Sequence, residues 1–86
     1  MVKIYSTSWC PSCISAKRFF DTENIKYQEI NIEEVGMSRK DLTELTGSGT
    51  VPQIVINNIS IGGFEDLLRI NESGELKKYL KNDSNK

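Results

Sequence analysis

The 86-residue sequence contains no histidine and only two cysteines. Without histidine, a serine or cysteine nucleophile has no imidazole partner, so catalysis of the Ser–His or Cys–His type is excluded within one chain. The commonest zinc ligand is missing too, and a Cys-x-x-Cys pair alone supplies only half of a tetrahedral zinc site. We therefore expect no metal site, and the chemistry of the two cysteines has to proceed without an imidazole base.

The sequence also lacks an excess of either charge and any long apolar run. Eleven basic and twelve acidic residues give a net charge of −1, which provides no overall field for nucleic acid or for an anionic membrane. No apolar stretch approaches the roughly 20 residues that span a bilayer, and the first residues lack the features of a signal peptide. We expect one small cytosolic, monomeric domain with no nucleic-acid or membrane partner.

The hydrophobic pattern predicts the element order β-α-β-α-β-β-α-α. Runs rich in β-branched and aromatic residues predict strands at 2–6, 26–32, 53–56 and 59–61. Apolar spacings of three and four predict helices at about 11–23, from 39 to near 47, from about 64, and from about 75. The domain is expected to cover 1–82, with a frayed tail at 83–86.

The connections between these elements predict an α/β fold. A helix between the first two strands makes them parallel, joined by a right-handed crossover. Asn57 and Asn58 tolerate the positive φ of a tight turn, so the last two strands are antiparallel. The result is a four-stranded mixed sheet flanked by helices.

Two local patterns add detail to the predicted helices. Ser38 and Asp41 have the spacing of a capping box at the start of the second helix. The apolar positions expected to face the core are Leu42 and Leu45 in the second helix, Phe64, Leu67 and Leu68 in the third, and Leu76, Tyr79 and Leu80 in the last.

Cys10-Pro11-Ser12-Cys13 lies where the first strand gives way to the first helix. Proline is favoured at the first helical position, which makes Cys10 the cap residue and places Cys13 in the first turn. The free N–H groups of that turn and the positive end of the helix dipole then face the Cys10 sulfur. Cysteines in such places have pKa values lowered from about 8.5 to roughly 3.5–7.5. We therefore predict that Cys10 attacks a target disulfide and that the more buried Cys13 resolves the mixed disulfide.

Other interpretations of the cysteine pair remain open at this point. The pair could be half of a zinc site completed by carboxylates or by a second chain. A structural disulfide across three residues closes almost no loop and adds little stability, and the cytosol disfavours it. Two inert core thiols are a further possibility. A Cys-x-x-Cys beside a βαβ pattern favours the redox interpretation.

Three motifs taken together resemble the glutaredoxin family: Cys10-Pro11-Ser12-Cys13, Thr50-Val51-Pro52 and Gly62-Gly63-Phe64-Glu65-Asp66-Leu67. The resemblance covers nearly the whole chain. It implies a thioredoxin-like fold and a cis peptide bond between Val51 and Pro52. It also implies glutathione as the reductant, bound by Ser12, Thr50, Val51, Pro52, Glu65 and Asp66. In the family, the backbone at Glu65 meets the γ-glutamyl carboxylate and the Asp66 side chain meets the ammonium group. Taken alone, the third motif could be only a turn and a helix start.

Three positions depart from the family's pattern. Family members often carry a lysine at the position of Thr7, a tyrosine at that of Ser12, and a basic residue at that of Gly49. Two cationic contacts to an anionic ligand are therefore missing from the motifs.

The resemblance implies a dithiol glutaredoxin that reduces protein disulfides and glutathione mixed disulfides, and is itself reduced by glutathione. A first alternative is a glutaredoxin-like redoxin with a similar Gly-Phe turn at Phe64, which takes electrons from thioredoxin reductase and serves ribonucleotide reductase. A second is a [2Fe–2S] carrier in which Cys10 and a glutathione thiol from each of two protomers hold the cluster; Pro11 argues against it. Trp9, directly before Cys10, is expected to form an apolar rim for protein substrates.

Overall fold

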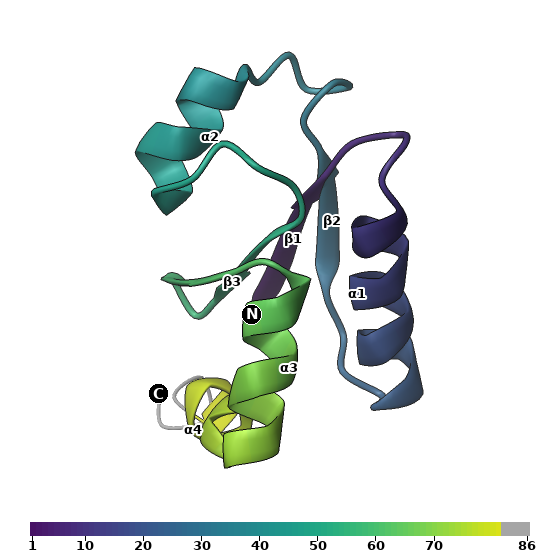
Figure 1. The fold of residues 1–86 in the computed structure, drawn as a ribbon, viewed down its shortest axis with the longest axis vertical. Helices are drawn as coiled ribbons and strands as arrows, with labels where there is room; N and C mark the ends of the chain where they lie inside the picture. The colour runs from purple at the N-terminus through teal and green to yellow at the C-terminus, as the bar shows by residue number, and fades with distance from the viewer. Residues whose placement is uncertain (82–86) are drawn as a thin grey trace.

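The computed structural model describes residues 1–81, and its elements follow the predicted order (Figure 1). The strands are β1 (Val2–Ser6), β2 (Gln28–Asn31), β3 (Gln53–Ile56) and β4 (Ile59–Gly62). The helices are α1 (Pro11–Thr22), α2 (Arg39–Thr46), α3 (Phe64–Ser73) and α4 (Glu75–Lys81). The predicted tail at 83–86 lies outside the described residues, so the boundary at 82 stays a prediction. Within residues 1–81, no helix combines the length and the apolar character that crossing a membrane requires.

The four strands form one mixed sheet in the order β2-β1-β3-β4. β1 and β2 run parallel, with Ser6 opposite Asn31, whereas β3 is antiparallel to both β1 and β4. Asn57 and Asn58 have φ values of 50° and 70° and form the tight turn between β3 and β4. The predicted mixed sheet is therefore confirmed.

β2 is shorter than the predicted strand at both ends. Its pairing with β1 begins only at Gln28, opposite Lys3. At the other end the Asn31 side chain accepts hydrogen bonds from the backbone N–H groups of Glu33 and Glu34, at 2.9 and 3.3 Å. An asparagine that bonds its own following backbone turns the chain, and the strand ends there.

Helices cover both faces of the sheet because successive strand side chains point to opposite sides. On one face the alternate residues of β1 and β3 pack against α1, α3 and α4, in a cluster that contains Val2, Ile4, Ala16, Phe20, Ile54, Ile56, Leu67, Ile70 and Leu76. On the other face Tyr5 packs with Ile32 and with Leu42 of α2. Figure 1 shows α2 standing apart from α1 and α3 across the sheet.

Two core predictions are wrong. Leu45 is 55% exposed and Leu68 is 37% exposed, although both were expected to face inward. α2 has only eight residues, and Leu42 is the one that it buries. In α3 the buried positions are Leu67 and Ile70, three residues apart, so Leu68 is turned toward solvent.

Truncating the two leucines of α2 should therefore have unequal effects. We expect Leu42→Ala to lower the free energy of unfolding by about 2–5 kcal/mol, because it opens a cavity under α2. Leu45→Ala serves as the matched control and should stay within about 0.5 kcal/mol of the native protein. Urea unfolding followed by circular dichroism measures both. Equal losses would show that α2 does not sit on the sheet through Leu42.

Candidate active site

Cys10 begins helix α1 as its cap residue. Its backbone is extended, with φ −154° and ψ 99°, and Pro11 takes the first helical position, as predicted. The Cys13 N–H donates a hydrogen bond to the Cys10 Sγ atom at 3.1 Å. The first turn of the helix thus directs a free N–H group at this sulfur, which is where an anion is stabilised.

The two cysteines form a disulfide, so the structure represents the oxidised protein. Their Cα atoms lie 5.2 Å apart. Cys10 keeps 8% of its surface exposed, whereas Cys13, on the inner face of α1, keeps 1%. The predicted order of exposure is confirmed, and solvent reaches this disulfide from the Cys10 side.

A groove of about 540 Å³ lies next to the disulfide. Its lining includes all six residues that the family resemblance implied for glutathione: Ser12, Thr50, Val51, Pro52, Glu65 and Asp66. The Cys10 Sγ atom lies 3.7 Å from the Val51 carbonyl oxygen, so the disulfide adjoins the groove at this wall. These residues come from three separate segments of the chain, and the fold brings them together.

The groove wall before β3 is fixed by its own polar contacts. The Val51–Pro52 peptide bond is cis, as the resemblance implied. Behind it the buried Gln53 side chain donates a hydrogen bond to the Thr50 hydroxyl at 3.1 Å. The backbone at Val51 is therefore held in place beside Cys10.

The opposite wall is the N-terminal end of α3. The Asp66 carboxylate accepts a hydrogen bond from the Gly63 N–H at 3.0 Å and pairs with Arg69. Chiefly the Gly63 hydrogen bond, and then Arg69, lower the pKa of Asp66 below its ordinary value. Gly62 has φ +116°, and a side chain there would collide with the Asp66 carboxylate. This end of the groove therefore has helix N–H groups and an ionised carboxylate within a few residues of each other.

Arg39, a residue that the motifs do not single out, places a cation against Gly49, which lies in the chain between the groove-lining residues Ser48 and Thr50. Its Nη1 atom donates a hydrogen bond to the Gly49 carbonyl oxygen at 2.8 Å. A Cβ atom on Gly49 would lie 2.8 Å from the Thr43 hydroxyl oxygen and 3.2 Å from the Arg39 carbonyl oxygen. The close approach of α2 therefore disfavours a side chain at 49, and the guanidinium of Arg39 reaches this place from the helix. No local sequence signal reveals the contact, because ten residues separate its partners.

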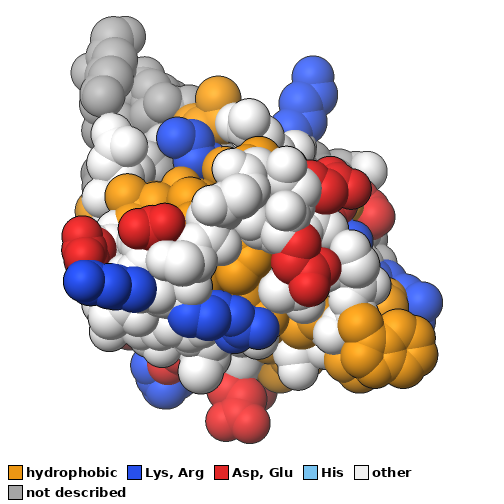
Figure 2. All heavy atoms as spheres, turned by 90° about the horizontal axis from the view of Figure 1, so that it is seen from above, with side chains coloured by type: hydrophobic (Ala, Val, Ile, Leu, Met, Phe, Trp, Pro, Cys, Tyr) orange, Lys and Arg blue, Asp and Glu red, His pale blue; other side chains and the backbone are white. Residues whose placement is uncertain are grey.

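The remaining surface around the site carries no dominant charge. Figure 2 shows acidic and basic side chains interspersed on the face seen from above, with hydrophobic atoms between them. Trp9, next to Cys10 in the chain, is 89% exposed. Among residues 1–81, no group of three or more histidine, cysteine or acidic side chains is placed to hold a metal ion.

Proteins that resemble this chain are glutaredoxins. A family model described as Glutaredoxin matches residues 2–61. The glutaredoxin of Pseudomonas aeruginosa is 39% identical over 79 residues, which cover 92% of this chain and 94% of that protein. Glutaredoxin 1 of Rickettsia prowazekii is 38% identical over 79 residues, covering 90% of this chain and 83% of that protein. The buckwheat glutaredoxin–glutathione complex matches with a TM-score of 0.84 at 26% identity, covering 94% of this chain and 76% of that chain. The predicted thioredoxin-like fold and family resemblance are confirmed.

The lowered pKa of Asp66 makes the start of α3 sensitive to acid. Its carboxylate is more acidic in the folded than in the unfolded chain, so its stabilisation is present at neutral pH and is lost as pH falls through the folded pKa. We expect Asp66→Asn to lower the free energy of unfolding at pH 7 by up to about 1 kcal/mol. The difference from the native protein should vanish in acid.

Urea unfolding measured from pH 7 downward tests this expectation. Glu72→Gln removes an acidic group from the last turns of the same helix and should not destabilise the protein, because a negative charge there opposes the helix dipole. A loss for Asp66→Asn that stays constant with pH would contradict the role of the carboxylate charge.

Proposed function

The chain belongs to the glutaredoxin family of thiol–disulfide oxidoreductases, and we propose that it uses glutathione to reduce protein disulfides and glutathione mixed disulfides. The observation that carries the proposal is that the disulfide and the expected glutathione-binding residues lie side by side. The Cys10–Cys13 disulfide adjoins a single groove, and that groove contains every residue expected to contact glutathione. A reactive sulfur beside a peptide-sized groove suits a thiol tripeptide.

In the proposed reaction the Cys10 thiolate of the reduced protein attacks one sulfur of the target disulfide. A bond forms between Cys10 and that sulfur, the target S–S bond breaks, and the departing thiolate takes up a proton. The Cys13 N–H, which donates a hydrogen bond to the Cys10 sulfur at 3.1 Å, stabilises the Cys10 thiolate before it attacks. The chain needs no imidazole for this step.

Cys13 completes the reduction of a protein disulfide. Its thiol loses a proton and attacks the Cys10 sulfur of the mixed disulfide, which releases the second product thiol and closes the Cys10–Cys13 disulfide. Two glutathione molecules then reduce this disulfide and leave as glutathione disulfide. The target gains two electrons and two protons, and the glutathione pair loses them. The Cα separation of 5.2 Å supports direct exchange between the two sulfurs.

The groove offers complementary contacts along the length of glutathione. We assign the γ-glutamyl end to the start of α3, where backbone N–H groups suit its carboxylate and Asp66 suits its ammonium group. Asp66 already pairs with Arg69, so the ligand has to share that carboxylate. The cysteinyl part lies along the Val51 backbone, and Arg39 is the cation available to the glycyl carboxylate. The likeness to a solved complex of buckwheat glutaredoxin with glutathione supports glutathione as the ligand.

We extend the proposal to the compartment and the acting unit. The cytosolic glutathione pool keeps thiols reduced, so the cytosol is where this reaction has its reductant. Both cysteines and the whole groove come from one chain, which supports a monomer as the acting unit.

The choice of electron donor tests the proposal most directly. We expect the oxidised protein to turn over a small mixed disulfide when NADPH, glutathione reductase and glutathione are supplied, with NADPH consumption as the measurement. Thioredoxin reductase with NADPH should not replace that system. Reduction by thioredoxin reductase alone would overturn glutathione as donor and favour the redoxin that serves ribonucleotide reductase.

Serine substitutions in the same assay separate the two cysteines. Cys10→Ser should reduce turnover to the uncatalysed level, since no other thiol is placed to attack. Cys13→Ser should keep turnover of glutathionylated substrates, because glutathione itself resolves the Cys10 mixed disulfide, and should lose reduction of protein disulfides. Equal activity of the two variants would contradict the assigned roles.

Arg39 should affect glutathione binding rather than chemistry. We expect Arg39→Ala to raise the KM for glutathione about two- to fivefold, as an exposed ion pair does, with kcat unchanged. Arg39→Lys should recover part of the loss because it keeps the charge. Lys40→Ala, which removes the neighbouring cation of the same helix, is the control and should leave the KM in place. If both alanine variants raised the KM equally, a general charge effect would replace the specific contact.

A further inference from the structure

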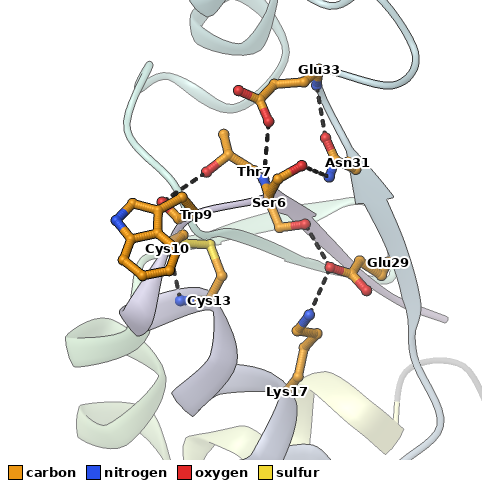
Figure 3. A network of polar contacts seen from close by, with 10 residues as sticks. Ser6, Thr7, Trp9, Cys10, Cys13, Lys17, Glu29, Asn31 and Glu33 are labelled. Carbon is orange, nitrogen blue, oxygen red and sulfur yellow. Dashed lines mark hydrogen bonds and ion pairs between the residues drawn. A yellow bond between two sulfur atoms is a disulfide. The ribbon is translucent and has the colours of Figure 1, made fainter.

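The segment that leads into Cys10 belongs to no helix or strand. β1 ends at Ser6 and α1 begins at Pro11. The backbone conformation of residues 7–9 determines where Cys10 lies. The Cys10 sulfur has to lie over the first turn of α1 for Cys10 to cap the helix. Figure 3 shows this segment together with the side chains that contact it from β2 and from the turn after β2.

Ser8, two residues before Cys10, is held by two of these side chains. Its backbone N–H donates a hydrogen bond to the Glu33 Oε1 atom at 3.0 Å. Its hydroxyl oxygen accepts one from the Asn31 side-chain amide at 3.1 Å. Asn31 also fixes Glu33 itself, because its Oδ1 atom accepts the Glu33 N–H at 2.9 Å.

These contacts continue the β1–β2 pairing beyond the strands. Ile32 makes a backbone hydrogen bond to the Ser6 carbonyl oxygen at 2.8 Å. Beyond that bond, the side chains of Asn31 and Glu33 reach the segment before Cys10. Glu29, two residues before Asn31, makes its contact with Ser6 while the strands are still paired. We call Glu29, Asn31 and Glu33 the brace. Glu29 lies at the start of the brace, where it accepts hydrogen bonds from Ser6 and from Lys17 of α1, both at 2.8 Å.

We propose that Glu33, at the end of the brace, is a positioning residue that sets the reactivity of the Cys10 thiol by holding Ser8. The proposal rests on the proposed function only in taking Cys10 as the attacking thiol. Glu33 touches neither cysteine. It acts by fixing the segment whose course places the Cys10 sulfur over the helix N–H groups.

The charge and the hydrogen bond of Glu33 have opposite effects on Cys10. Hydrogen bonds from the Ser8 backbone and then from its hydroxyl lower the pKa of Glu33, so the carboxylate is ionised at neutral pH. A negative charge near the segment disfavours a thiolate at Cys10. The hydrogen bond favours the thiolate, because it preserves the cap geometry. Two neutral substitutions, one that keeps an acceptor oxygen and one that has none, therefore test the positioning effect without a difference in charge.

The experiment compares Glu33→Gln with Glu33→Ala in the full chain, reduced with dithiothreitol and then freed of it. Glutamine keeps an acceptor oxygen for the Ser8 N–H, whereas alanine has none. The rate of Cys10 alkylation by iodoacetamide, followed by mass spectrometry at a series of pH values that extends below the pKa of the thiol, reports the reactive thiolate. We expect the thiol pKa of Glu33→Ala to lie about half a unit above that of Glu33→Gln, so that below this pKa Glu33→Ala reacts about threefold more slowly. Titration of the thiolate absorbance should show the same difference.

Two further variants keep the result decisive. Glu33→Asp retains the charge but shortens the side chain, so it should react more slowly than the native protein. Glu34→Ala removes the adjacent carboxylate, which does not contact Ser8, and should not slow the reaction. Unfolding curves for each variant exclude a general loss of structure.

Equal alkylation rates for Glu33→Gln and Glu33→Ala in folded proteins would overturn the inference. That outcome is distinguishable from failure of the proposed function, which concerns the electron donor. A native protein that glutathione does not reduce would overturn the proposed function, while the alkylation series would still decide the role of Glu33.

Discussion

The hydrogen bond from the Cys13 N–H to the Cys10 sulfur is the interaction on which the rest of the site depends. A helix usually begins with an oxygen-bearing side chain that accepts such a bond, and here a cysteine takes that place. Because the acceptor is sulfur, the unsatisfied N–H groups that open any helix become a means of favouring a thiolate. A position that favours a thiolate therefore arises from an ordinary structural requirement of the helix.

This arrangement makes demands on parts of the chain that lie far from the cysteines. β1 determines where the segment before Cys10 starts. Asn31, the last residue of the parallel strand β2, and Glu33 after it contact that segment beyond the end of the backbone pairing. β3 brings the cis bond at Pro52 beside the disulfide, and β4 leads into α3 through glycines that let Asp66 fold back on the Gly63 N–H. All four strands thus end at or begin from the same site.

The sequence predicts the features whose causes are local. Pro11 after Cys10, the Ser38–Asp41 capping box and the Asn57–Asn58 turn each involve residues within four positions of one another, and the structure contains all three. The features that were missed depend on contacts across the fold. Leu45 and Leu68 have the spacing of core residues. They are exposed because the rest of the fold covers only a narrow side of each helix. The hydrogen bonds from Arg39 to Gly49 and from Ser8 to Glu33 join separate segments of the chain. The hydrophobic pattern of the sequence does not show that these segments lie close together.

The order of the strands also affects how the sheet avoids edge-to-edge pairing with a second copy of the chain. β2 and β4 occupy the two outer positions of the sheet, and each is only four residues long. An unpaired strand edge is a template for another chain, and natural proteins limit that risk with short, irregular or charged edges. Here β2 carries Glu29 on the edge, and the pairing of β4 shifts register before its final glycine. Little regular backbone is left for a second copy to join, so the sheet resists growing by edge-to-edge aggregation.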